Sequence, residues 1–111
     1  GDGTLDLILA NRGARGTNQL HLLLNTGSAF ASSDISGSSA LANALALGDV
    51  NGDGALDLVV GNNGLNELFM NNGSGTFHKS LTFTGAETST TTAVALGDVD
   101  GDGALDIVFG I

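Results

Sequence analysis

An acidic, glycine-rich tract occurs twice in this chain almost unchanged, and it constrains the fold more than any other feature. One copy spans residues 48–58 (GDVNGDGALDL) and the other spans residues 97–107 (GDVDGDGALDI). Oxygen-bearing side chains occupy positions 1, 3, 5 and 9, counted from Asp49 or Asp98, and glycine occupies position 6. A shortened copy opens the chain at residues 1–7 (GDGTLDL). The tract therefore predicts a repeat and a cation site together.

The similarity extends beyond the tract and gives a repeat of about 50 residues, a length typical of solenoids and propeller blades. Residues 5–11 match residues 56–62, and residues 22–27 match residues 68–73. Within one repeat, short apolar segments predict four strands, at residues 44–47, 56–60, 67–70 and 77–83. In the fourth strand, alternation predicts one side formed by Phe77, Lys79, Leu81 and Phe83. Four antiparallel strands per repeat describe one propeller blade.

The expected fold class is therefore all-β, a β-propeller segment of about two four-stranded antiparallel blades. Residues 1–38 are expected to supply strands two to four of one blade, residues 41–84 a complete blade, and residues 92–111 strands one and two of a third. Propellers close with about four to eight blades. A full ring thus requires either a longer polypeptide or head-to-tail assembly of several copies, because an isolated segment leaves strand edges and apolar faces uncovered.

The charge follows the repeat. The formal net charge is −9, from 12 acidic and 3 basic residues, and nine of the acids lie inside the three tracts. Arg12, Arg15 and Lys79 are too few for a phosphate-neutralising surface, so no nucleic-acid partner is expected. No apolar run is long enough to span a bilayer. The chain has no cysteine and therefore gives no redox signal.

Each complete tract is expected to bind calcium. A hard divalent cation takes six to eight oxygen ligands, and glycine at position 6 permits the curl that gathers oxygens from positions 1, 3 and 5. The position-7 carbonyl and the position-9 carboxylate complete the set. The predicted ligands are Asp49, Asn51, Asp53, the Ala55 carbonyl and Asp57 in one tract, and Asp98, Asp100, Asp102, the Ala104 carbonyl and Asp106 in the other. Because Asn51 lacks the charge of Asp100, the first of these sites should bind more weakly.

The composition of the tract allows two other interpretations. An EF-hand needs a glutamate at position 12, where this chain has Val60 or Phe109, so the EF-hand is excluded. An acidic β-turn that binds nothing would account for the Asp, Asn and Gly content. It does not require an acid at position 9 or repetition of the whole pattern. A set of oxygen ligands without His or Cys fits Ca²⁺ better than Zn²⁺, and the expected role of the ion is structural.

These residues resemble the FG-GAP/VCBS repeat family, the calcium-binding blades of integrin-α-like β-propellers. The resemblance rests on the run from Ala46 to Asn62 and continues from Asn66 to Phe77. It implies that the calcium loop joins the first and second strands of each blade, and it implies a secreted or cell-surface protein. In the opening copy it carries over to Asp2, Thr4 and Asp6. Positions 1 and 3 are missing there, so an intact site needs residues from elsewhere.

The leading functional hypothesis is a non-catalytic, calcium-stabilised propeller module for extracellular binding, adhesion or scaffolding, with calcium and a protein or glycan ligand as partners. A lectin with sites between blades is an alternative, although the chain has no Trp or Tyr and its five Phe look like core residues. The family also includes accessory domains of secreted polysaccharide-active enzymes. An enzyme is not expected, because the carboxylates belong to the loops and His21 and His78 have no evident partner.

Overall fold

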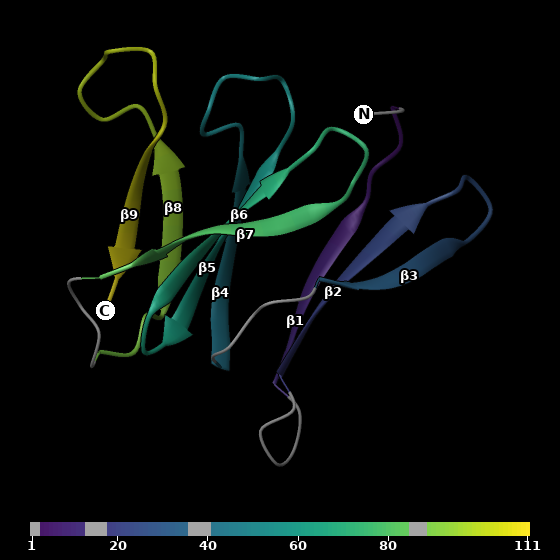
Figure 1. Cartoon of the computed structure of the whole chain (residues 1–111), viewed down its shortest axis with the longest axis horizontal. Helices are drawn as coiled ribbons and strands as arrows, with labels where there is room; N and C mark the ends of the chain where they lie inside the picture. Colours follow the sequence, from purple (N-terminus) through teal and green to yellow (C-terminus); the bar gives the residue numbers. More distant parts are fainter. Residues whose placement is uncertain (1–2, 13–17, 36–40, 85–88) are drawn as a thin grey trace.

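The computed structural model describes residues 3–12, 18–35, 41–84 and 89–111, and within these ranges it contains nine strands and no helix. The strands form three antiparallel sheets of three, four and two strands, stacked side by side (Figure 1). The all-β prediction is confirmed, and the three sheets are consistent with segments of propeller blades. In the described part of the chain, no helix has the length and apolarity needed to cross a membrane.

Neighbouring strands in each sheet follow one another along the chain. The first sheet contains β1 (Leu7–Arg12), β2 (Asn18–Asn25) and β3 (Phe30–Ile35). The second contains β4 (Leu41–Gly48), β5 (Asp57–Asn63), β6 (Asn66–Asn71) and β7 (Phe77–Phe83), and the third contains β8 (Ala93–Gly97) and β9 (Asp106–Gly110). Residues 1–2, 13–17 and 36–38 of the first predicted blade range lie outside the described residues.

The main core lies between the first and second sheets. Leu20, Leu22 and Ile35 of the first sheet pack against Leu58, Val60 and Phe69 of the second. The last three side chains have no exposed surface. Strand β5 is buried on both faces from Asp57 to Asn62, as its apolar run predicts. Leu56, included in the predicted strand, is 54% exposed because it belongs to the preceding loop.

Small residues allow the second and third sheets to approach closely. A Cβ atom added at Gly48 would lie 2.6 Å from Leu96 Cδ1, and one added at Gly61 would lie 2.6 Å from Thr91 Cγ2. Leu96 of β8 and Thr91, which precedes β8, therefore occupy the space in which a larger residue at Gly48 or Gly61 would place its side chain. This explains the alternation of small and large residues in the first strand of the blade, because the small ones face the neighbouring sheet.

The predicted alternation in the fourth strand is wrong beyond Lys79. Lys79 pairs with Phe69, whereas Leu81 pairs with Leu68, because a β-bulge places an extra residue, Ser80, between the two pairs. Adjacent residues of β6 point to opposite faces. Phe77 and Lys79 therefore share one face of the second sheet, while Leu81 lies on the other and is 48% exposed.

The two complete acidic tracts and the described residues of the opening copy lie along one edge of the stacked sheets (Figure 1). The β4–β5 loop, the β8–β9 loop and the segment leading into β1 are all at the top of Figure 1. In the two complete copies, the tract joins the first strand present in its sheet to the next one. The repeat thus brings its acidic segments to a common side of the molecule.

Candidate metal centre

The aspartate at position 1 organises each complete loop. Asp49 Oδ1 accepts hydrogen bonds from the N–H groups of Gly52 (2.8 Å) and Asp53 (3.1 Å), and Asp49 Oδ2 accepts one from Gly54 (2.8 Å). Gly52 and Gly54 have φ angles of +77° and +87°, which side-chain-bearing residues rarely adopt. The two glycines therefore permit the curl that wraps the backbone around this carboxylate.

The β8–β9 loop repeats this arrangement. Asp98 Oδ1 accepts hydrogen bonds from Gly101 (2.7 Å) and Asp102 (3.0 Å), and Asp98 Oδ2 accepts one from Gly103 (2.8 Å). At position 3, Asp100 Oδ1 accepts a hydrogen bond from Asp102 N, as Asn51 Oδ1 does from Asp53 N, and both distances are 3.1 Å. The two loops thus share one conformation, and the difference between them at position 3 is one of charge.

The aspartate at position 9 closes the loop and also ties it to the rest of the sheet. Asp57 Oδ2 accepts a hydrogen bond from Val50 N (3.1 Å), and Asp57 Oδ1 accepts one from Asn71 N at the end of β6 (3.0 Å). Asp57 has no exposed surface. In the opening copy, Asp6 Oδ1 accepts the equivalent bond from Asn25 N (2.9 Å).

Sequence reasoning assigned position 9 to the metal alone and missed this structural role. The available signal was the recurrence of asparagine at residues 25 and 71, at matching places in the two repeats. Asp106 accepts the loop-closing bond from Val99 N (2.8 Å). In this third copy, no strand after β9 is among the described residues.

Three carboxylates converge in the β8–β9 loop. One ligand oxygen each from Asp98, Asp100 and Asp106 lies within 4.8 Å of the other two. Oxygens gathered this closely on a curled backbone suit a hard cation such as Ca²⁺. The β4–β5 loop offers the same three positions with two carboxylates and one amide, from Asp49, Asp57 and Asn51.

The other predicted ligands have different surroundings. Asp53 Oδ1 and Asp102 Oδ1 each accept a hydrogen bond of 2.9 Å from the backbone N–H two residues further along the chain. The ligand roles of the Ala55 and Ala104 carbonyls stay predictions. Thr4 Oγ1 donates a hydrogen bond to the Asn25 carbonyl at 3.1 Å. Asp2 lies outside the described residues. The described members of the opening copy are therefore bound to the end of β2.

Backbone N–H groups favour the ionised form of one aspartate in each loop, Asp53 and Asp98. The N–H of Ala55, followed by the Asn51 side chain, holds the pKa of Asp53 below its ordinary value. The N–H of Gly103, with smaller contributions from Gly101 and Asp102, lowers the pKa of Asp98 in the same way. A lowered pKa favours the charged form, so both carboxylates are ionised at neutral pH and available to a cation.

A family model for FG-GAP-like repeats matches the chain twice, over residues 1–60 and 49–109. The chain belongs to the FG-GAP-like repeat family. The first match includes the whole tract of residues 48–58, and the second includes residues 49–58 and the whole tract of residues 97–107. Together they reach from the opening copy to Phe109 in β9. No curated protein sequence matches the chain significantly.

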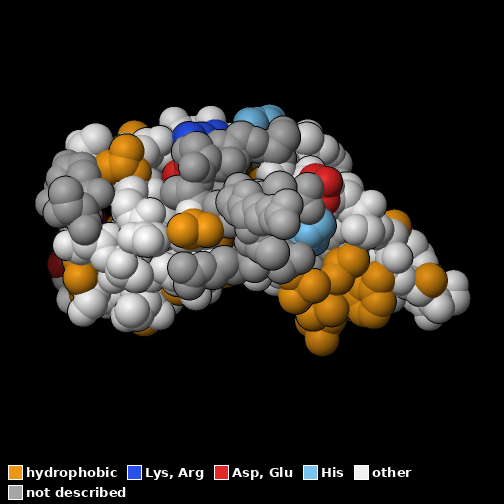
Figure 2. All heavy atoms as spheres, turned by 90° about the horizontal axis from the view of Figure 1, so that it is seen from below, with side chains coloured by type: hydrophobic (Ala, Val, Ile, Leu, Met, Phe, Trp, Pro, Cys, Tyr) orange, Lys and Arg blue, Asp and Glu red, His pale blue; other side chains and the backbone are white. Residues whose placement is uncertain are grey.

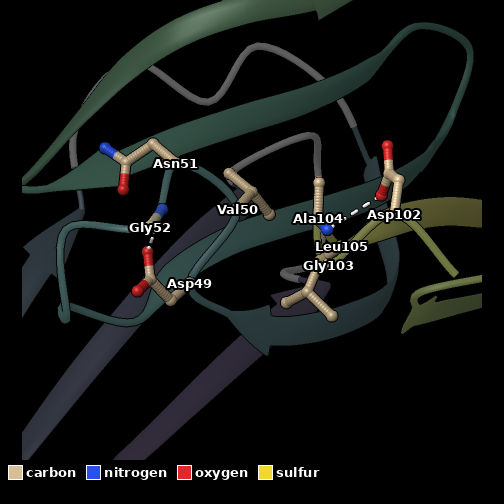
Figure 3. A pocket seen from close by; sticks show the side chains of 8 residues that line it. All are labelled: Asp49, Val50, Asn51, Gly52, Asp102, Gly103, Ala104 and Leu105. Atoms are coloured by element: carbon tan, nitrogen blue, oxygen red, sulfur yellow. Dashed lines mark hydrogen bonds between the residues drawn. The ribbon is translucent and has the colours of Figure 1, made fainter.

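Membership in the FG-GAP-like family agrees with the fold, a propeller segment built from successive blades. The two loops flank a hollow of about 310 Å³ (Figure 3). Asp49, Val50, Asn51 and Gly52 line it from the β4–β5 loop, and Asp102, Gly103, Ala104 and Leu105 line it from the β8–β9 loop. The acidic loops of adjacent FG-GAP-like blades therefore face a shared space.

The histidines lie outside this centre. His21 Nδ1 is 2.7 Å from Asp34 Oδ1 across the β2–β3 pair, so the expectation that His21 has no partner is wrong. The pair forms only through the register of β2 and β3, and the sequence pattern does not predict that register. His78 is exposed on β7.

Replacing Asp57 should separate its structural role from any role in metal binding. In EGTA, Asp57→Ala is expected to lower the free energy of unfolding by about 1–3 kcal/mol, because the N–H groups of Val50 and Asn71 lose a buried acceptor. Asp53→Ala is the matched control, since it removes an equal charge from an exposed position of the same loop and should cost about 0.5 kcal/mol or less. Equal losses in urea unfolding would contradict the structural role.

Proposed function

We propose that this chain is a non-catalytic, calcium-stabilised segment of an extracellular β-propeller that serves as a binding or scaffold module. The observation that carries the proposal is the convergence of Asp98, Asp100 and Asp106 oxygens within 4.8 Å on a loop already curled by backbone hydrogen bonds. Membership in the FG-GAP-like family supports the propeller part of the proposal.

The chemistry of the donors supports calcium in particular. Both loops offer carboxylate and carbonyl oxygens, and the β4–β5 loop adds the amide oxygen of Asn51. Hard cations bind such oxygen ligands, whereas nitrogen and sulfur ligands are typical of zinc. Ca²⁺ tolerates irregular coordination, which suits oxygens spread along one curled loop better than the strict octahedral geometry required by Mg²⁺. The residues Asp49, Asn51, Asp53 and Asp57, and Asp98, Asp100, Asp102 and Asp106, would hold the ions.

The role of the ion in this proposal is to stabilise the blade edge. Without a cation, the carboxylates at positions 1, 5 and 9, joined by position 3 in the β8–β9 loop, repel one another at short range. Extracellular modules bind calcium with dissociation constants of about 10⁻⁴–10⁻³ M. At calcium about tenfold above a dissociation constant of about 10⁻⁴ M, each site adds about 1.4 kcal/mol to the free energy of unfolding.

Calcium should therefore raise the melting temperature, and EGTA should reverse the effect. The expected rise is on the order of 5 °C per occupied site, from the usual relation between stability and melting temperature in small domains. Calorimetric titration of the EGTA-treated protein should show two sites, the tighter of which is lost in Asp100→Ala.

The matched variant is Asn51→Asp, which gives the β4–β5 loop the acidic pattern of the β8–β9 loop and should tighten the weaker site. Magnesium at the same concentration controls for general screening of charge. A melting temperature that does not respond to calcium, or a titration without heat above the magnesium control, would refute the calcium proposal.

A further inference from the structure

Two apolar faces remain uncovered at the ends of the sheet stack. The outer face of the first sheet carries Leu7, Leu9 and Leu23, with Leu7 and Leu9 47% and 48% exposed. Figure 2 shows hydrophobic side chains gathered at the end of the molecule that β1–β3 form. The outer face of the third sheet carries Ala95 opposite Val108, which is 51% exposed.

The repeat shows what kind of surface covers each face. Leu7 and Leu9 correspond to Leu58 and Val60 in the next repeat, and both of these are fully buried against the first sheet. Ala95 and Gly97 correspond to Ala46 and Gly48. Gly48 lies against the third sheet. The two uncovered faces are therefore the counterparts of the two faces of the second sheet, of which the large-residue face packs against the first sheet and the small-residue face packs against the third.

The equivalent residues Gly48 and Gly97 identify one specific contact expected between the two uncovered faces. At Gly48, an added Cβ would lie 2.6 Å from Leu96 Cδ1 and 2.9 Å from Leu105 Cδ1. Leu96 of β8 and Leu105 of the β8–β9 loop therefore fill the space above this glycine. At Gly97, the equivalent position, an added Cβ would meet nothing within 4 Å. Leu5, the equivalent of Leu105, is 86% exposed at the opposite end of the stack.

We propose that these two faces bind each other between copies of this chain, head to tail. The face of Leu7, Leu9 and Leu23 on one copy covers the face of Ala95, Gly97 and Val108 on a second copy, and Leu5 enters the space above Gly97. The contact is heterologous, because it joins two different surfaces. A second copy fits this pair of faces because it carries both halves of the interface, with large side chains on one and small ones on the other. This inference does not depend on bound calcium.

Light scattering coupled to size-exclusion chromatography tests this contact between copies. Two variants are compared with the wild type, and each variant introduces one charge on one of the two faces. The wild-type chain is expected to elute at a mass above its monomer mass of 11.0 kDa, and the mass should increase with concentration. Leu9→Arg and Val108→Arg should each elute as monomers. Because each variant retains one intact face, an equimolar mixture of the two should form a dimer. His78→Arg places the same charge on exposed β7 and should associate like the wild type.

Several results would overturn the proposal. A wild-type monomer at all concentrations would do so, as would either face variant retaining the wild-type mass. A mixture that stays monomeric would show that the two faces do not bind each other. Gly97→Leu fills the space above the glycine without adding charge, and it should also prevent association. Circular dichroism verifies folding, and measurements in calcium and in EGTA separate this result from the calcium proposal.

Discussion

Replacing Lys79 with methionine is expected to lower the free energy of unfolding by about 3 kcal/mol, at the lower end of the cost of breaking a buried ion pair. Lys79 Nζ lies 2.8 Å from Glu67 Oε1, and the Glu67 side chain is 1% exposed. Methionine retains most of the apolar stem of lysine but not its charge. The variant therefore leaves the Glu67 carboxylate in the core without its ammonium partner. The lower end applies because the Lys79 side chain is 31% exposed.

The network around Glu67 supports this expectation. Glu67 pairs with Val60 across the β5–β6 hairpin, and so lies on the face of the second sheet that packs against the first. Its Oε2 accepts a hydrogen bond of 3.4 Å from Asn62 Nδ2, and that amide group also donates to the Leu65 carbonyl at 2.7 Å. A hydrogen bond of 3.4 Å from a neutral amide is weaker than an ion pair of 2.8 Å, so loss of the ammonium group is expected to destabilise the buried carboxylate.

Urea unfolding of three variants would test the pair. Lys79→Met should be clearly destabilised, and the double variant Lys79→Met with Glu67→Gln should recover part of the loss because the buried charge is removed. His78→Met, on the exposed neighbouring position, should change stability by about 0.5 kcal/mol or less. A Lys79→Met protein as stable as the His78→Met control would show that the ion pair contributes nothing.

This ion pair also shows which features of the fold the sequence alone does not predict. The acidic tract and the strands were predictable because glycine at fixed positions, turn residues and apolar periodicity are local signals that recur in each repeat. Glu67 was placed on a strand, but its burial depends on the first sheet, which covers it from about 50 residues away. Lys79 was assigned to a face correctly, although the bulge at Ser80 that separates Lys79 from Leu81 had no local signal.

The candidate site also combines features that the sequence predicts with features that it does not. The curl around Asp49 and Asp98 follows from the order of residues within the loop, and the hydrogen bonds agree with the convergence that the spacing implies. The bond from Asn71 to Asp57 joins loop and strand across 14 residues, and spacing alone does not reveal it. Phe30 is a residue for which the prediction from the sequence is wrong. It was expected in the core, but it is 50% exposed because it lies on the uncovered face of the first sheet.

Leu58→Ala should produce a loss of comparable size, about 3–4 kcal/mol, for a different physical reason. Leu58 has no exposed surface, and it packs in the core cluster with Leu20, Leu22 and Phe69. Removing a buried leucine side chain costs about 2–5 kcal/mol, depending on how far the surroundings collapse into the cavity. Strand β5 is hydrogen-bonded to β4 on one edge and to β6 on the other, so it cannot move to close the gap.

Leu81→Ala is the matched control, because it makes the same chemical change at a β7 position that is 48% exposed. Denaturant unfolding should place its loss well below that of Leu58→Ala, at about 1 kcal/mol or less. The comparison also tests whether the first two sheets unfold together, because Leu58 is buried by side chains from the first sheet. If the first sheet opened independently of the second, Leu58 would already be partly exposed, and the two variants would lose similar amounts of stability. A loss confined to Leu58→Ala, in a single cooperative transition, is therefore the result expected of two blades that share one core.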